Sequence, residues 1–233
     1  MTLTFPPLMI GDAVSGGDDP FEQACAKAAL GCEAGTVVHN VQADKLRAAI
    51  VFAPEVALED AMAMLPLCGV GFQNALGALA PPEVAVHLTW AGGIKVNGAS
   101  CGGFSVAASD KDPASQPDWL VIGLDVPLMQ MTPDPGQRPD QTALYDEGCA
   151  EVDPERLLES WARHTLVWIN RWEEEGMRPL HDEWMGLADG IGEDTVILGQ
   201  AGTFVGVDER FGALLRDAER THLLALSALL GER

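Results

Sequence analysis

The Asn97-Gly98 dipeptide, set between two short apolar segments, constrains the fold of this chain more than any other feature. Asn-Gly is the favoured pair for a two-residue type I′ turn, because both positions of that turn need a positive φ. Around it, the sequence predicts a strand that ends in Trp90, a turn at Gly92-Gly93, the tight hairpin itself, and a second apolar strand after Gly102-Gly103.

The turn also predicts the register of the two strands beside it. Strands that flank a two-residue turn pair Val96 with Ala99 and Lys95 with Ser100. Directly opposed residues point to the same face of a sheet. We therefore expect Lys95 to project from the same face as Ser100.

Composition limits the classes of partner. The chain has 14 Lys and Arg against 35 Asp and Glu, a net charge of −21, and 47% hydrophobic residues, which support a real core. Phosphate backbones repel so acidic a chain, so we expect no nucleic-acid partner. The acidity also serves solubility. An anionic substrate such as ATP would need a local basic pocket built from few cations.

The ends and the cysteines give no targeting or metal signal. Residues 1–14 lack the basic start of a secretory signal, and no apolar run approaches the roughly 18 residues of a membrane helix. The five cysteines are scattered and form no CxxC pair, so neither a disulfide framework nor a metal site is predicted. We expect a reduced, cytoplasmic protein without membrane contact.

Periodicity predicts a mixed order of elements. Residues 1–18 read as an irregular arm, and a helix capped by Asp19 begins at Pro20. There follow strands at 36–41 and 48–53, a helix over 58–79 interrupted at Pro66, the hairpin, a strand at 118–125 and an amphipathic helix over 154–175. Short β-like segments follow residue 189. We therefore predict two domains, 1–188 and 189–233.

This order of elements resembles the biotin/lipoate protein ligase superfamily, from about Asp19 to Leu230. Residues 157–189 are similar to that family's amphipathic helix, acidic Glu-Gly turn and short helix with an internal Trp. The resemblance implies an α+β fold, with a mixed sheet flanked by helices and then a small SH3-like β-barrel. Some members of that superfamily carry an N-terminal DNA-binding domain, but the sequence has no N-terminal helix-turn-helix, so we expect none here.

The resemblance also implies site residues, although the motifs depart from the family pattern. The family's Gly/Arg-rich loop, which holds biotin and its adenylate, corresponds to residues 42–47, where the glycines are gone. Of the family's Lys-Trp-Pro-Asn-Asp motif only the Trp is kept, and the catalytic lysine falls on Ser100. The ligand-binding residues so implied are Gln42, Lys45, Arg47, Trp90, Gly92, Gly93, Gly102 and Gly103.

Lys95 is the candidate to replace the missing lysine. Activation of a carboxylate by ATP concentrates negative charge between two anions, and a fixed cation there stabilises the transition state. We hypothesise that Lys95 supplies this ammonium beside Ser100. The alternative is a solvated strand lysine.

The other candidates each have two interpretations. Lys45 and Arg47 form either a clamp for phosphate or carboxylate or a surface loop. Trp90 either stacks on a ligand ring or forms core or pocket wall. The paired glycines either admit a ligand to the backbone or relieve crowding in the sheet. Cys101 is either an acyl-accepting nucleophile or a buried, inert thiol. His39 is either a general base or structural.

Two functions follow from the resemblance. The first is a ligase that activates a small carboxylic acid with ATP and passes it to a lysine of a carrier domain. Biotin, lipoate or octanoate would be the acid, and Mg²⁺ would arrive with ATP rather than in a protein cage. The second is a pseudoenzyme that binds a small acid or a biotinyl or lipoyl carrier domain without activation. Acyl transfer through Cys101 is a third option, and a homodimer is left open.

Overall fold

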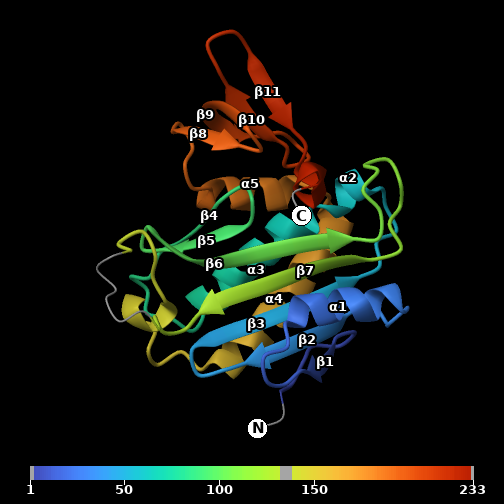
Figure 1. The fold of residues 1–233 in the computed structure, drawn as a ribbon, viewed down its shortest axis with the longest axis vertical. Coiled ribbons are helices and arrows are strands. Elements are labelled where there is room, and N and C mark those ends of the chain that lie inside the picture. The colour runs from blue at the N-terminus through green and yellow to red at the C-terminus, as the bar shows by residue number, and fades with distance from the viewer. Residues whose placement is uncertain (1–2, 132–137, 232–233) are drawn as a thin grey trace.

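A computed structural model describes residues 3–131 and 138–231 of the chain. These residues form two β-sheets, in which most neighbouring strands are antiparallel. The larger sheet has the strand order β1-β2-β3-β7-β6-β5-β4, and the smaller has the order β11-β10-β9-β8 (Figure 1). The larger sheet is built from β1 (Ile10–Ala13), β2 (Thr36–Val41), β3 (Lys45–Phe52), β4 (Val86–Leu88), β5 (Gly93–Val96), β6 (Ala99–Ala108) and β7 (Leu120–Pro127).

Helices cover the two faces of the larger sheet unequally. Figure 1 shows α1 (Pro20–Ala29) in front of the sheet, over β2, β3 and β7, and α3 (Met64–Gly77) and α4 (Pro154–Glu175) behind it. The main core lies between the sheet and these two rear helices, and it includes alternate residues of β3 such as Leu46 and Ile50. A smaller apolar cluster lies under α1. Successive side chains of β3 therefore point alternately to the main core behind the sheet and to the smaller cluster under α1.

The start of α1 is as the sequence predicts. The Asp19 carboxylate accepts a hydrogen bond from the Phe21 N–H at 2.8 Å, and Pro20 occupies the first turn. Phe21 packs onto β7 at Gly123, where a Cβ would lie 2.5 Å from the Phe21 ring. Glycine at this position thus lets α1 lie close on the sheet.

The long helix α4 is also confirmed with its predicted bounds. Asp153 caps it through hydrogen bonds from the N–H groups of Glu155 and Arg156. Its buried Trp161 donates from Nε1 to the Cys68 carbonyl of α3 at 3.0 Å. This bond ties the two rear helices together within the core.

The structure corrects several boundaries of the sequence prediction. The strand predicted to end in Trp90 ends at Leu88, and the strands predicted after Gly103 and at 118–125 are β6 and β7, with the bounds given above. The arm at 1–18 contains β1, which pairs in parallel with β2. The strand predicted from residue 48 begins at Lys45. The break in the helix over 58–79 falls between α2 (Leu58–Ala61) and α3, and Pro66 lies within the first turn of α3. A proline costs nothing there, because first-turn N–H groups have no intrahelical partner.

A separate four-stranded antiparallel sheet follows α5 (Arg178–Leu187), in line with the α+β class that the sequence predicts. Its strands are β8 (Asp194–Ile197), β9 (Gln200–Val207), β10 (Ala213–Arg216) and β11 (Thr221–Leu224). Arg210 joins it to α2 through ion pairs to Glu59 at 2.7 Å and Asp60 at 3.2 Å. Short 3₁₀ helices complete the chain at η2 (Leu144–Glu147) and η3 (Leu226–Gly231). In the described part of the chain, no helix has the length and apolar character needed to cross a membrane.

Candidate functional site

The lysines and arginines of the larger sheet all lie on one face. They are Lys45 and Arg47 of β3 and Lys95 of β5. On β3 they alternate with Leu46, which points into the main core, and on β5 Lys95 lies between the core residues Ile94 and Val96. These cations therefore share the front face of the sheet, the face that α1 partly covers.

The hairpin has the predicted turn and register. Asn97 and Gly98 have φ values of 51° and 91°, as a type I′ turn requires. Lys95 pairs with Ser100, and Val96 pairs with Ala99. The backbone N–H of Ser100 points away from β5 and donates to the Asp140 carbonyl at 2.8 Å.

Lys95 is held by an acidic partner from the far end of the chain. Its Nζ lies 2.7 Å from Oδ2 of Asp189, two residues after the end of α5. Asp189 is itself fixed, because its N–H donates to the Leu88 carbonyl of β4 at 2.9 Å. The Lys95 ammonium therefore faces the junction between the two sheets.

Arg47 lies at a different place on the same face, beside a small cavity of about 90 Å³. Its Nη1 is 4.0 Å from Oδ2 of Asp19, at the N-terminus of α1. Lys45 Nζ is 3.9 Å from Oδ2 of Asp125 on β7. The cavity is lined by Asp19, Pro20, Phe21, Arg47, Ala48, Ser105, Gly123, Leu124 and Asp125. No residue of β5 lines it, so the structure does not bring Lys95 into the Arg47 cavity.

The Arg47 guanidinium has unused hydrogen-bonding capacity. Only 16% of its side chain is exposed, and its Nε is buried without a hydrogen-bond partner in the described part of the chain. The contact to Asp19 is longer than a hydrogen bond. A buried donor without a partner is costly, so an added hydrogen-bond acceptor at this atom would be stabilising.

Gln42 supports this site rather than entering it. Its Nε2 donates to the Gly16 carbonyl at 2.8 Å. Asn40 Nδ2 donates to the same carbonyl at 3.2 Å and to the Asp18 carbonyl at 3.3 Å. Both amides hold the segment that leads into α1, and they thereby fix Asp19 opposite Arg47.

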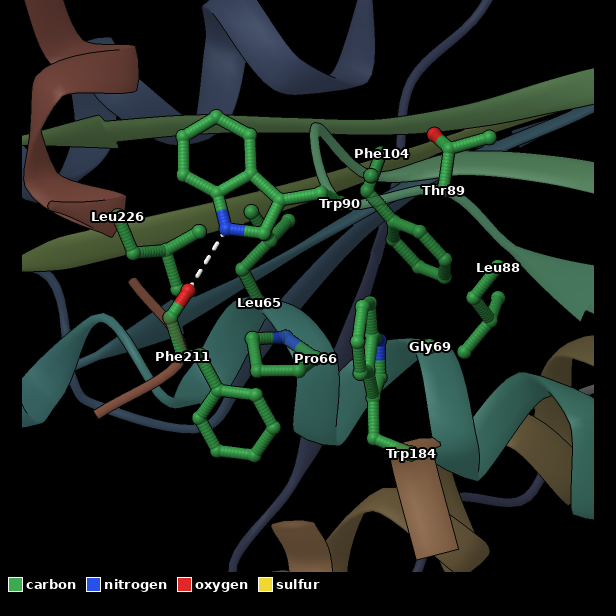
Figure 2. Close-up of a pocket in the computed structure, with 11 residues that line it drawn as sticks. Leu65, Pro66, Gly69, Leu88, Thr89, Trp90, Phe104, Trp184, Phe211 and Leu226 are labelled. Carbon is green, nitrogen blue, oxygen red and sulfur yellow. Dashed lines mark hydrogen bonds between the residues drawn. The ribbon is translucent and has the colours of Figure 1, made fainter. Parts of the chain in front are cut away.

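Trp90 lies apart from these cations, in the main core. It is 5% exposed, and its Nε1 donates to the Phe211 carbonyl at 2.7 Å (Figure 2). The cavity beside it measures only about 10 Å³. Figure 2 shows the indole close to Leu65 and Leu226, above Pro66 of α3. This placement fits the core-or-wall interpretation of Trp90.

The paired glycines are packed against the protein's own atoms. At Gly102, φ is +80° and an added Cβ would lie 2.0 Å from the Asp125 carbonyl oxygen. The added Cβ atoms at Gly93 and Gly103 would also come within 3.0 Å of Thr89 and Gly92, and that at Gly92 would lie 3.2 Å from Phe104. Crowding within the sheet thus accounts for all four.

Cys101 and His39 lie on the core side of the sheet, away from Arg47. Cys101 is fully buried, and burial raises the pKa of its thiol to about 12. His39 packs beside the Phe5 ring, and burial lowers its pKa. Neither faces Ser100 or the Arg47 cavity. Among the described residues, no cluster of His, Cys, Asp and Glu is suited to a metal ion.

Sequence reasoning missed the acidic members of the site. Asp19 was assigned only as a helix cap, and Asp125 only as a strand residue. Residues 120–124 of β7 are buried on both faces, so the strand has no alternation that could have placed Asp125 beside Arg47. The role of Asp189 could not be predicted from the sequence, because its partner Lys95 lies far away along the chain.

The model of the biotin/lipoate A/B protein ligase family matches residues 5–186. The chain therefore belongs to that family. The model of a domain of unknown function, DUF4444, matches residues 191–232.

Solved structures agree with this assignment. A biotin protein ligase-like protein of unknown function from Silicibacter sp. TM1040 is 62% identical, with a TM-score of 0.93 over 98% of this chain and 99% of that one. The biotin protein ligase from Aquifex aeolicus is 18% identical, with a TM-score of 0.72 over 89% and 92%. Its complex with biotin and ATP has the same identity and TM-score over 94% and 96%. These latter two show a shared fold. A search of the curated proteins gave no match.

Proposed function

We propose that this chain binds a small carboxylic acid at Arg47 and does not activate it with ATP. The main support for this proposal is that each of the three cations on the front face of the sheet is paired with a carboxylate. Each faces a carboxylate: Lys45 faces Asp125, Arg47 faces Asp19, and Lys95 faces Asp189. The site therefore has no surplus positive charge for a triphosphate.

The three pairs differ in how easily an anion could enter. The contacts of Lys45 and Arg47 are 3.9 and 4.0 Å, beyond hydrogen-bond length. The Lys95 contact of 2.7 Å is a charge-assisted hydrogen bond. A carboxylate is thus better accommodated at Arg47 than a phosphate at Lys95.

Arg47 has the right chemistry for a carboxylate. Its planar guanidinium presents several donors in a fixed geometry that matches two carboxylate oxygens. Its Nε has no hydrogen-bond partner in the described part of the chain, and Arg47 lines the cavity at which the acid would enter. The cavity of about 90 Å³ is far below the 300–1,000 Å³ of ordinary ligand pockets, so only the head of the acid fits without movement.

A second candidate is an ATP-dependent ligase for biotin, lipoate or octanoate. The observation that favours it is the hairpin register, which puts Lys95 directly opposite Ser100. In this case Lys95 would leave Asp189 to contact phosphate, Mg²⁺ would enter with ATP, and a lysine of a carrier domain would accept the acyl group.

Calorimetric titration with biotin, lipoate and octanoate tests the first candidate. We expect one of these acids to bind equally well with and without MgATP. Arg47→Ala should abolish the heat of binding, and Arg47→Lys should weaken it at least tenfold, because an ammonium offers no two-point contact. Arg216→Ala, in the C-terminal sheet, is the matched control and should bind normally. Unchanged binding by Arg47→Ala would exclude the site.

A further inference from the structure

A large groove lies outside the Arg47 cavity and shares no lining residue with it. It measures about 1,080 Å³ and runs between the start of β1, the end of β3, the segment before α2, and α4. Its apolar lining includes Leu8, Ile10, Phe52, Val56, Met64, Leu166, Ile169 and Trp172. Helix α4 contributes three of these at helical spacing, so one stripe of α4 is left partly open to solvent.

Several of these apolar side chains are exposed. Leu8 is 83% exposed, Ile10 is 59% exposed and Val56 is 36% exposed. Single exposed apolar residues are ordinary, whereas a contiguous group along one groove is typical of a binding surface.

Leu8 is held outward by an unfavourable backbone. The Met9 N–H donates to the Pro6 carbonyl at 3.1 Å, and Leu8 has φ of 70° in this turn. In a turn of this kind the third position favours glycine, because it needs a positive φ. The backbone of Gly35 packs tightly against the Leu8 carbonyl, where an added Cβ would lie only 2.0 Å away. The fold thus fixes a leucine at the edge of the groove where glycine would be easier.

The charges at the groove have one sign. Glu33, Glu55 and Glu173 line it, and no Lys or Arg is among its lining residues. Within residues 3–131 and 138–231, none of these three carboxylates forms an ion pair. An apolar floor with unpaired acids complements a ligand that is both apolar and basic.

We propose that this groove binds an amphipathic segment of a partner protein, with apolar side chains on one face and Lys or Arg beside them. The volume of about 1,080 Å³ lies just above the 300–1,000 Å³ typical of small-molecule pockets, and several of the apolar lining residues are exposed. Exposed apolar anchors in an open groove are typical of sites that take an amphipathic helix. A second copy of the chain is a poor occupant, because two chains of net charge −21 repel each other.

The probe is a labelled helical peptide of leucine and lysine, about 18 residues long, with leucine on one face. Fluorescence anisotropy measures its binding to the full chain. The variant with Glu33→Gln, Glu55→Gln and Glu173→Gln should bind about tenfold more weakly. The control carries Glu83→Gln, Glu151→Gln and Glu219→Gln, which change the net charge equally outside the groove. It should bind as the unchanged chain does.

Leu8→Gly tests the apolar part without endangering the fold. Glycine relieves the backbone at φ of 70°, so this variant should be at least as stable as the parent and yet bind the peptide several-fold more weakly. The proposal is overturned if both triple variants lose affinity equally, if Leu8→Gly binds normally, or if a leucine–glutamate peptide binds as tightly. A dimer in sedimentation that Leu8→Gly dissociates would instead assign the groove to a second copy.

Discussion

Arg47 determines the chemistry of the candidate site at the scale of single residues. It combines a buried, unpartnered Nε with a loose contact to Asp19, whereas Lys95 is closely bound to Asp189. The two cations share a face of the sheet, but the carboxylate of Asp189 binds Lys95 more closely than that of Asp19 binds Arg47. The site is therefore closer to a carboxylate receptor than to a phosphate-handling centre.

The cysteines give a direct prediction at this scale. Cys68, Cys101 and Cys149 are buried, whereas Cys25 and Cys32 are partly exposed. Because burial raises the pKa of Cys101 to about 12, almost none of it is thiolate near neutral pH. Native labelling with a thiol reagent, read by mass spectrometry, should modify Cys25 and Cys32 first and leave the other three until unfolding. Early modification of Cys101 would reopen acyl transfer through that residue.

His39 predicts a pH dependence of stability. Burial lowers its folded pKa below the ordinary value of 6.5, although Asp12 and Glu155 act in the opposite direction. Below pH 6.5 the unfolded chain binds a proton that the folded chain does not. The stabilisation is therefore complete above pH 6.5 and is lost as the pH falls toward the folded pKa. Urea unfolding at about pH 7.5 and about pH 5.5 should show a smaller loss for His39→Gln than for the parent; equal losses would contradict the assignment.

At the scale of elements, the hairpin of β5 and β6 shows how tightly the sheet is packed. Gly102 and Gly98 both have positive φ, but only Gly102 lies against another strand. They therefore form a matched pair for separating backbone strain from steric contact.

Gly102→Ala should lower the free energy of unfolding by about 2 kcal/mol or more, because its Cβ would overlap the Asp125 carbonyl. Gly98→Ala has free space around it and should cost only about 1 kcal/mol of backbone strain. Denaturant unfolding measures both values. Equal losses would show that crowding does not explain the glycine at 102.

Elements specified by neighbouring residues could be predicted from the sequence, whereas contacts between residues distant in the sequence could not. The Asp19-Pro20 cap and the Asn97-Gly98 turn each specify their structure within a few residues, so α1 and the hairpin register follow from the sequence. Strand β1 was missed because its short segment is mostly exposed and has no apolar alternation. The Lys95–Asp189 pair was missed because it forms only when α5 returns to β4.

At the scale of the whole molecule, the two sheets are joined through buried and charged contacts. Trp90, in the turn between β4 and β5, donates to the Phe211 carbonyl, and Arg210 next to Phe211 pairs with α2. The position of Asp189 next to Lys95 depends on the same junction. The C-terminal part thus fixes one end of the front face of the larger sheet.

Trp90→Phe should weaken this junction by about 1–2 kcal/mol, since the buried Phe211 carbonyl loses its donor. Hydrogen exchange should accelerate in β9 and β10 more than in β2 and β3. Trp168→Phe is the matched control, because its Nε1 donates to Asn74 Oδ1 at 2.8 Å, a bond between α4 and α3. If both variants accelerate the same amides, the Trp90 bond does not couple the sheets.

The most direct test of the central claim is pyrophosphate exchange into ATP, measured beside acid binding in the same preparation. Biotin, lipoate and octanoate should each give no exchange above background, even where calorimetry shows binding that depends on Arg47. Acid-dependent exchange that disappears in Lys95→Ala would contradict the account. It would show that Lys95 leaves Asp189 and acts in acid activation.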